Sequence, residues 1–139
     1  MATSSISRAA VAADRPDRSL QLALTAARVA DENRGRDIVI LDMREITPVF
    51  DYFVLATGSS LRQLHAISDE IEQTVKRTLG DRKLGLEGYS EGGWVLIDYG
   101  DVVVHLFDAK SREYYSLEEL WGDAKRVPFT PELSVKSAE

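Results

Sequence analysis

Residues 94–107 read Trp-Val-Leu-Ile-Asp-Tyr-Gly-Asp-Val-Val-Val-His-Leu-Phe and predict a β-hairpin. Two apolar runs flank Gly100 and Asp101, and a two-residue loop that begins with glycine favours a type II′ turn. With this loop, Asp98 pairs with Val103, and alternate residues point to opposite faces of the sheet. Both faces are then largely apolar, so we expect helices or a partner to cover each of them.

The predicted register divides the hairpin residues between two faces. Trp94 and Tyr99 lie on opposite faces, and a large aromatic residue in a strand either packs in the core or anchors an interface. Asp98 and His105 are diagonal neighbours on one face, within reach of each other. They form either a catalytic or metal-binding pair or a hydrogen-bonded pair inside the sheet. The sequence places no third ligand or nucleophile nearby, which favours the hydrogen-bonded pair.

The rest of the chain contains three helical patterns and three further strand patterns. Ser60 with Gln63 forms a capping box before the longest helical pattern, and Ser116 with Glu119 forms another near the C-terminus. We therefore predict an α/β fold, with a mixed sheet of about five strands and helices packed on it. The predicted strands are 37–43, 52–57, 86–89, 94–99 and 102–107, and the predicted helices, caps included, are 19–33, 60–80 and 116–124.

The 139-residue chain contains 44% hydrophobic residues and no cysteine. Its length and composition predict one globular domain, over residues 17–126, with a disordered tail at 1–16 and a second tail at 127–139. The lack of cysteine excludes disulfides and cysteine–zinc sites and suits a reducing compartment. We expect a cytoplasmic location. The Ser- and Ala-rich N-terminal tail leaves a mitochondrial or plastid transit peptide as the alternative.

The net charge of −6 bears on the class of partner. Proteins that bind nucleic acid usually carry a basic surface that neutralises phosphates. An acidic chain therefore favours a basic protein and argues against a primary contact with nucleic acid. No apolar run approaches the ~20 residues that a membrane-spanning helix needs, so we expect no membrane contact.

Two segments could carry chemistry. The turn at residues 57–60 leads from a strand into a helix, where backbone N–H groups can bind an anion, but it lacks the glycine and lysine pattern of a phosphate loop. A tight turn and helix cap is the favoured interpretation. Asp69 and Glu70 are the carboxylates available after this turn, and neighbours on a helix point about 100° apart. They cannot converge on the two metal ions of a nucleotidyltransferase. We predict no catalytic residues, no metal and no cofactor.

The motifs together resemble the Iojap family of ribosomal silencing factors over about residues 20–125. The block at residues 94–105 is the most specific part of the resemblance. The other matching segments are 37–42 (Asp-Ile-Val-Ile-Leu-Asp), 51–59 (Asp-Tyr-Phe-Val-Leu-Ala-Thr-Gly-Ser), Gln63 with 66–69 (Ala-Ile-Ser-Asp), Glu87-Gly88, and Arg112-x-x-Tyr115-x-Leu-Glu-x-Leu-Trp121.

This resemblance implies a nucleotidyltransferase-like fold without the catalytic carboxylates. It also implies binding to the fourteenth protein of the large ribosomal subunit, which blocks joining to the small subunit and represses translation. Organelle relatives are linked to large-subunit assembly, and a homodimer is compatible with the apolar hairpin faces. A large-subunit assembly factor and a metal-dependent nucleotidyltransferase are the alternative functions.

The partner-binding residues that we expect lie on the hairpin: Trp94, Asp98, Tyr99 and Asp101. The block that contains them is the most specific part of the resemblance. Its aromatic groups can desolvate a contact, and its carboxylates can meet Lys or Arg on a basic partner. Because Trp94 and Tyr99 alternate across the strand, we expect one of them at the interface and the other in the core.

Overall fold

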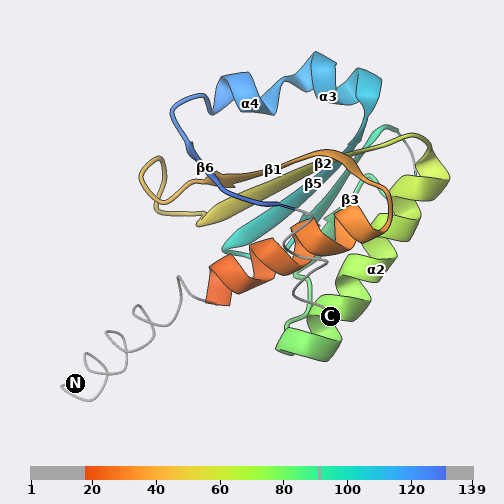
Figure 1. The fold of residues 1–139 in the computed structure, drawn as a ribbon, viewed down its shortest axis with the longest axis horizontal. Coiled ribbons are helices and arrows are strands. Elements are labelled where there is room, and N and C mark those ends of the chain that lie inside the picture. Colours follow the sequence, from red (N-terminus) through yellow and green to blue (C-terminus); the bar gives the residue numbers. More distant parts are fainter. Residues whose placement is uncertain (1–17, 91, 131–139) are drawn as a thin grey trace.

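The computed structural model describes residues 18–90 and 92–130, which form a six-stranded sheet with helices on both faces (Figure 1). The strand order is β3-β4-β5-β2-β1-β6. β2 and β5 are parallel, and all other neighbours are antiparallel. The predicted α/β class with a mixed sheet is therefore confirmed. The strands are β1 (Arg36–Asp42), β2 (Tyr52–Gly58), β3 (Gly85–Glu87), β4 (Trp94–Asp98), β5 (Val102–Asp108) and β6 (Lys125–Val127).

Helices cover the two faces of the sheet unequally. The helix over residues 18–32 and α2 (Leu61–Leu79) lie on one face, and α3 (Ala109–Tyr115) and α4 (Leu117–Leu120) cross the other (Figure 1). In the described part of the chain, no helix combines the length and the apolar character needed to span a membrane.

The β4–β5 hairpin has the register that its sequence predicts. Asp98 pairs with Val103, and the backbone N–H of Tyr99 donates to the carbonyl of Val102 over 2.9 Å. Gly100 has a φ of +91°, a conformation that glycine adopts without steric cost. The two-residue loop therefore closes the hairpin, and the division of its side chains between two faces is confirmed.

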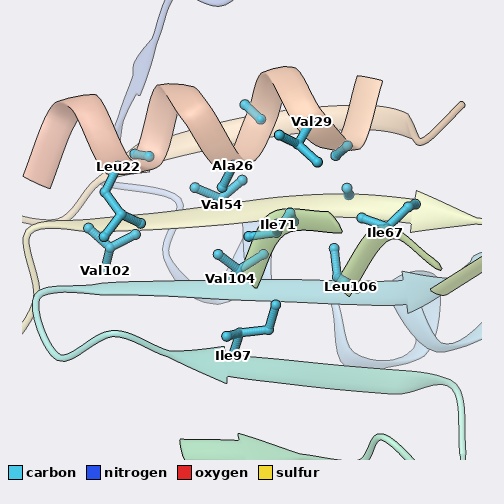
Figure 2. Packing of buried hydrophobic residues seen from close by; sticks show 14 of the residues in the cluster. Leu22, Ala26, Val29, Val54, Ile67, Ile71, Ile97, Val102, Val104 and Leu106 are labelled. Carbon is cyan, nitrogen blue, oxygen red and sulfur yellow. The ribbon is translucent and has the colours of Figure 1, made fainter. Parts of the chain in front are cut away.

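The larger core lies between the sheet and its two long helices. Figure 2 shows Leu22 and Ala26 of the N-terminal helix and Ile71 of α2 packed on Val54 and Val104 of the two central strands. All five side chains are at most 4% exposed. Alanines at positions 23, 26, 27 and 30 form the buried stripe of the N-terminal helix, and small side chains allow its backbone to approach the sheet closely.

The ends of α2 follow the predicted capping signals, with one difference. The hydroxyl of Ser60 accepts a hydrogen bond from the backbone N–H of Gln63 over 3.1 Å, and Gly80 ends the helix with a φ of +73°. In a capping box the Gln63 amide would bond back to Ser60. Its oxygen instead accepts from the hydroxyl of Ser59 over 2.8 Å, and its nitrogen donates to the carbonyl of Asn33 over 3.1 Å. Gln63 thereby ties the N-terminal helix to α2.

The prediction for the C-terminal segment was wrong in three respects. No sequence prediction covered α3. Ser116 has a φ of +47°, makes no side-chain capping bond to α4 and donates to the carbonyl of Glu113, so the second capping box does not form. The helix predicted through residue 124 ends at Leu120, and Lys125–Val127 forms β6 on the edge of β1. This pairing joins segments about 85 residues apart, which local patterns cannot predict.

The predicted tails fall largely outside the described residues. Residues 1–16 and 131–139 lie outside them. Within the region predicted as the C-terminal tail, Val127 belongs to β6 and Phe129 packs against the larger core.

Gly88 is a position at which the fold requires glycine. Its φ is +77°, and an added Cβ would lie 2.0 Å from the carbonyl oxygen of Trp94. Gly80 has a similar φ of +73°, with no atom within 4 Å of such a Cβ. We expect Gly80→Ala to lower the free energy of unfolding by about 1 kcal/mol. Gly88→Ala should lower it by about 3 kcal/mol or more, because it adds overpacking to the same backbone strain. Denaturant titration measures both values, and equal losses would show that the Trp94 backbone moves aside freely.

Candidate functional site

The sheet face beneath α3 and α4 combines aliphatic side chains with a group of aromatic rings in mutual contact. Trp94 lies half-buried there, with its ring centroid 5.1 Å from that of Phe107 and 5.8 Å from that of His105. Phe53 of β2 packs edge-on against both His105 and Trp121. This smaller core is covered by two short helices that contribute one buried residue, Leu117.

An exposed aromatic patch extends from this face onto α3. Tyr115 lies 4.6 Å from Trp94 and 5.0 Å from Tyr114, measured between ring centroids. Tyr114 is 80% exposed and Tyr115 is 46% exposed. We call Trp94, Tyr114 and Tyr115 the aromatic patch. Large exposed aromatic groups in contact with one another are typical of protein interfaces.

Arg112 connects α3 to its neighbours through two hydrogen bonds. Its guanidinium donates to the hydroxyl of Thr57 over 2.9 Å and to the carboxylate of Glu118 over 2.8 Å. The Arg112 hydrogen bond lowers the pKa of the Glu118 carboxyl. These bonds connect the end of β2 to both short helices. Arg112 and Tyr115 both belong to the sequence motif that resembles the Iojap family.

The four predicted partner-binding residues do not form one cluster. Trp94 begins β4 and Asp98 ends it, so these two lie about 13 Å apart at the strand rise of 3.3 Å per residue. Asp98, Tyr99 and Asp101 gather at the hairpin tip, where the carboxylate of Asp98 accepts from the backbone N–H of Gly100 over 2.7 Å. The Asp101 carbonyl accepts from the backbone N–H of Asp51 over 2.7 Å. All four side chains are half-buried.

Trp94 and Tyr99 have different surroundings, as their alternation predicts. Tyr99 packs against the larger core, on the helix-covered side of the sheet. Its hydroxyl is buried and has no hydrogen-bond partner among the described residues. Burial, followed by the nearby carboxylates of Glu72 and Asp81, raises the pKa of this hydroxyl well above its usual range. Trp94 lies on the opposite face and packs against the smaller core beneath α3 and α4.

Asp98 and His105 share a face, but no hydrogen bond joins these two described side chains. Asp98 bonds to the hairpin loop, and Nδ1 of His105 accepts from the indole N–H of Trp94 over 3.2 Å. His105 is 5% exposed, and its Nε2 has no partner among residues 18–90 and 92–130. The predicted hydrogen bond between Asp98 and His105 is therefore wrong, and His105 instead bonds to Trp94.

The segments considered for chemistry have structural partners. Both carboxylate oxygens of Asp69 accept from the hydroxyl of Tyr89 over 3.1 Å, and Glu70 is exposed on α2. In the turn before α2, Ser60 caps the helix and Gly58 packs against Leu64, which fits the favoured turn-and-cap interpretation. Within the described ranges, no group of three or more His, Cys, Asp or Glu side chains is arranged to hold a metal ion.

Tyr114 is not among the predicted site residues and Tyr115 was predicted on no element, because both lie on α3. A local signal was available: Asp108 follows a strand, and its side chain caps α3 by accepting from the backbone N–H of Ser111 over 2.7 Å. Asp is a preferred N-cap residue. Two adjacent tyrosines in the helix that follows would then have indicated an exposed aromatic group.

The buried state of His105 leads to a pH-dependent stability. Burial lowers the pKa of His105 to about 4, from 6.5 for the free side chain. Between these values the unfolded chain binds a proton that the folded chain does not, so stability should fall as the pH falls from about 6.5 to 4. Protonation of His105 should account for roughly 2–3 kcal/mol of this loss in the free energy of unfolding. The variant His105→Gln should lack this contribution to the pH dependence. Denaturant titrations across this range test the difference, and His105 ring NMR signals that titrate near pH 6.5 would contradict it.

Comparisons with known proteins agree with the architecture and the motifs. A family model described as "Ribosomal silencing factor during starvation" matches residues 16–139. The chain is 46% identical to the ribosomal silencing factor RsfS of Bacillus subtilis over 99 residues. This matched stretch covers 71% of this chain and 83% of that protein. It is 33% identical over 92 residues to the mouse protein named "Mitochondrial assembly of ribosomal large subunit protein 1", covering 65% of this chain and 40% of that protein.

Solved structures show the same fold. A crystal structure of a Chromobacterium violaceum protein superposes with a TM-score of 0.71 at 35% identity, covering 80% of this chain and 91% of that one. The family that the motifs indicate is thus confirmed, whereas the nucleotidyltransferase likeness stays a prediction. The chain belongs to the ribosomal silencing factor family, which includes proteins named Iojap.

Proposed function

We propose that this protein binds the large ribosomal subunit through its fourteenth protein and blocks joining to the small subunit, so that translation is repressed. The observation that carries the proposal is the aromatic patch, in which the exposed Tyr114 and Tyr115 of α3 stand beside the half-buried Trp94. Family membership supplies the ribosome as the target, because relatives are named ribosomal silencing factors. The net charge of −6 suits docking on a basic ribosomal protein.

The aromatic patch has the physical character of a binding hot spot. Aromatic side chains bury a large area with few rotatable bonds, so they supply binding energy at a small cost in entropy. The indole N–H of Trp94 already bonds to His105, which orients the ring before a partner arrives. We propose Trp94 as the anchor of the contact, with Asp98 and Asp101 at the hairpin tip meeting Lys or Arg at its rim.

The proposed action is steric and involves no catalytic turnover. A 15.5 kDa protein bound to the surface of the large subunit that meets the small subunit excludes the small subunit without any chemical step. The bacterial relatives suggest a cytoplasmic site of action for this chain. A homodimer is compatible with the exposed apolar side chains and remains part of the proposal.

A role in large-subunit assembly is the second candidate, and the name of the mouse relative favours it. Both functions use the same surface and differ in when the protein binds. Silencing predicts binding to mature large subunits and loss of joined ribosomes on addition of the protein. Assembly predicts binding to immature particles, which would accumulate when the protein is depleted. Sedimentation of purified subunits with and without the protein separates the two.

Substitutions in the aromatic patch should affect binding to large subunits, whereas substitutions of Tyr99 should affect stability. Trp94→Ala and Tyr115→Ala should each weaken binding to large subunits by about 2 kcal/mol or more, because each removes a proposed contact residue. Tyr99→Ala should lower the free energy of unfolding by about 3–5 kcal/mol, and the folded fraction should bind like wild type. Thermal unfolding is measured first, and binding then follows by co-sedimentation. Tyr99→Phe is the control variant. It should keep wild-type stability and binding, because the hydroxyl that it removes has no hydrogen-bond partner among the described residues.

Two outcomes would contradict this assignment. If the folded Trp94→Ala and Tyr115→Ala variants block subunit joining at wild-type concentrations, the aromatic patch is not the silencing surface. If the wild-type chain does not bind purified large subunits at all, the proposed function itself is wrong.

A further inference from the structure

A basic segment runs from the end of α2 into the following loop. Residues 76–83 contain four basic side chains and one carboxylate, within a chain whose net charge is −6. Lys76, Arg77, Arg82 and Lys83 are all exposed.

Three of these cations line a hollow of about 370 Å³. Its walls are Glu72, Gln73 and Lys76 of α2 and Asp81, Arg82 and Lys83 of the loop. We call this hollow the basic cleft. It adjoins the hairpin tip, because the backbone N–H of Leu84 donates to the carbonyl of Asp98 over 2.6 Å. It therefore lies at the end of β4 opposite Trp94, away from the aromatic patch.

The two carboxylates of the basic cleft already have basic partners. Glu72 forms an ion pair with Lys83, and Asp81 pairs with Arg18 over 2.9 Å. Among the described residues, neither the Lys76 ammonium nor the Arg82 guanidinium has an ion-pair or hydrogen-bond partner. Two uncompensated cations thus face one concave surface, where nearby low-dielectric walls strengthen their field toward an anion.

We propose that the basic cleft binds backbone phosphates of RNA on the large subunit, as a second contact beside the docking of the aromatic patch. This inference rests on the proposed function, which places the protein on a particle that contains RNA. Exposed Lys and Arg side chains neutralise phosphates without reading sequence. The contact is electrostatic and secondary, so it is compatible with an acidic chain whose main partner is a protein.

A salt series on purified large subunits tests the proposal with the full chain. The double variant Lys76→Gln/Arg82→Gln removes the two unpaired cations. Each phosphate contact contributes roughly 0.7–0.9 to the slope of log affinity against log salt. We expect the variant to lower the magnitude of that slope by about 1–2 and to bind roughly tenfold more weakly near 50 mM salt.

A matched control removes the same charge elsewhere. Arg36→Gln/Arg62→Gln neutralises two exposed arginines that lie outside the basic cleft and have no ion-pair partner within the described ranges. This control should keep the wild-type slope, apart from a small change due to net charge. Thermal unfolding of both double variants establishes that each is folded before binding is measured.

The outcomes separate this inference from the proposed function. Equal slopes for the cleft variant and the control would overturn the RNA contact while leaving the docking proposal in place. An equal loss of binding to the isolated fourteenth protein would also overturn it, since that result assigns the cleft to a protein contact. A wild-type chain that does not bind large subunits would overturn both proposals together.

Discussion

The parallel pairing of β2 with β5 is the constraint on which the rest of the structure depends. The two strands pair over seven residues, from Tyr52 with Val102 to Gly58 with Asp108, and nearly every side chain on them is buried. A parallel pair needs a long crossover, and residues 59–101 supply it through α2, β3 and β4. Because both faces of this pair are apolar, both must be covered.

The cover on the two faces differs in kind. On one face, two long helices close a large aliphatic and alanine-rich core. On the other face, α3 and α4 together bury one side chain, and aromatic rings provide much of the packing. Arg112 anchors this thin cover to β2 and α4. The imbalance leaves Trp94 and Tyr115 accessible and gives the molecule a face suited to a protein partner.

Charge is distributed as unevenly as apolar surface. The acidic chain carries a basic segment at the end of α2, and the hairpin connects this end to the aromatic patch. A protein of this size can therefore present an aromatic contact and a cationic contact to one large particle. The two proposals use different physics: desolvation of aromatic groups in one case, and neutralisation of phosphates, which salt weakens, in the other.

The sequence by itself determined the elements whose signals are local. The Gly100–Asp101 loop fixed the hairpin register, and Ser60 and Gly80 fixed the ends of α2, because turn and cap preferences act over a few residues. Alternation also placed Trp94 and Tyr99 on opposite faces. Only the tertiary structure decided which face is open, since that depends on where α3, α4 and β6 pack. Local periodicity does not encode the pairing of Lys125–Val127 with β1, nor the contact between Tyr115 and Trp94. These contacts join segments distant in sequence, and burial in the folded chain, rather than propensity, selects them.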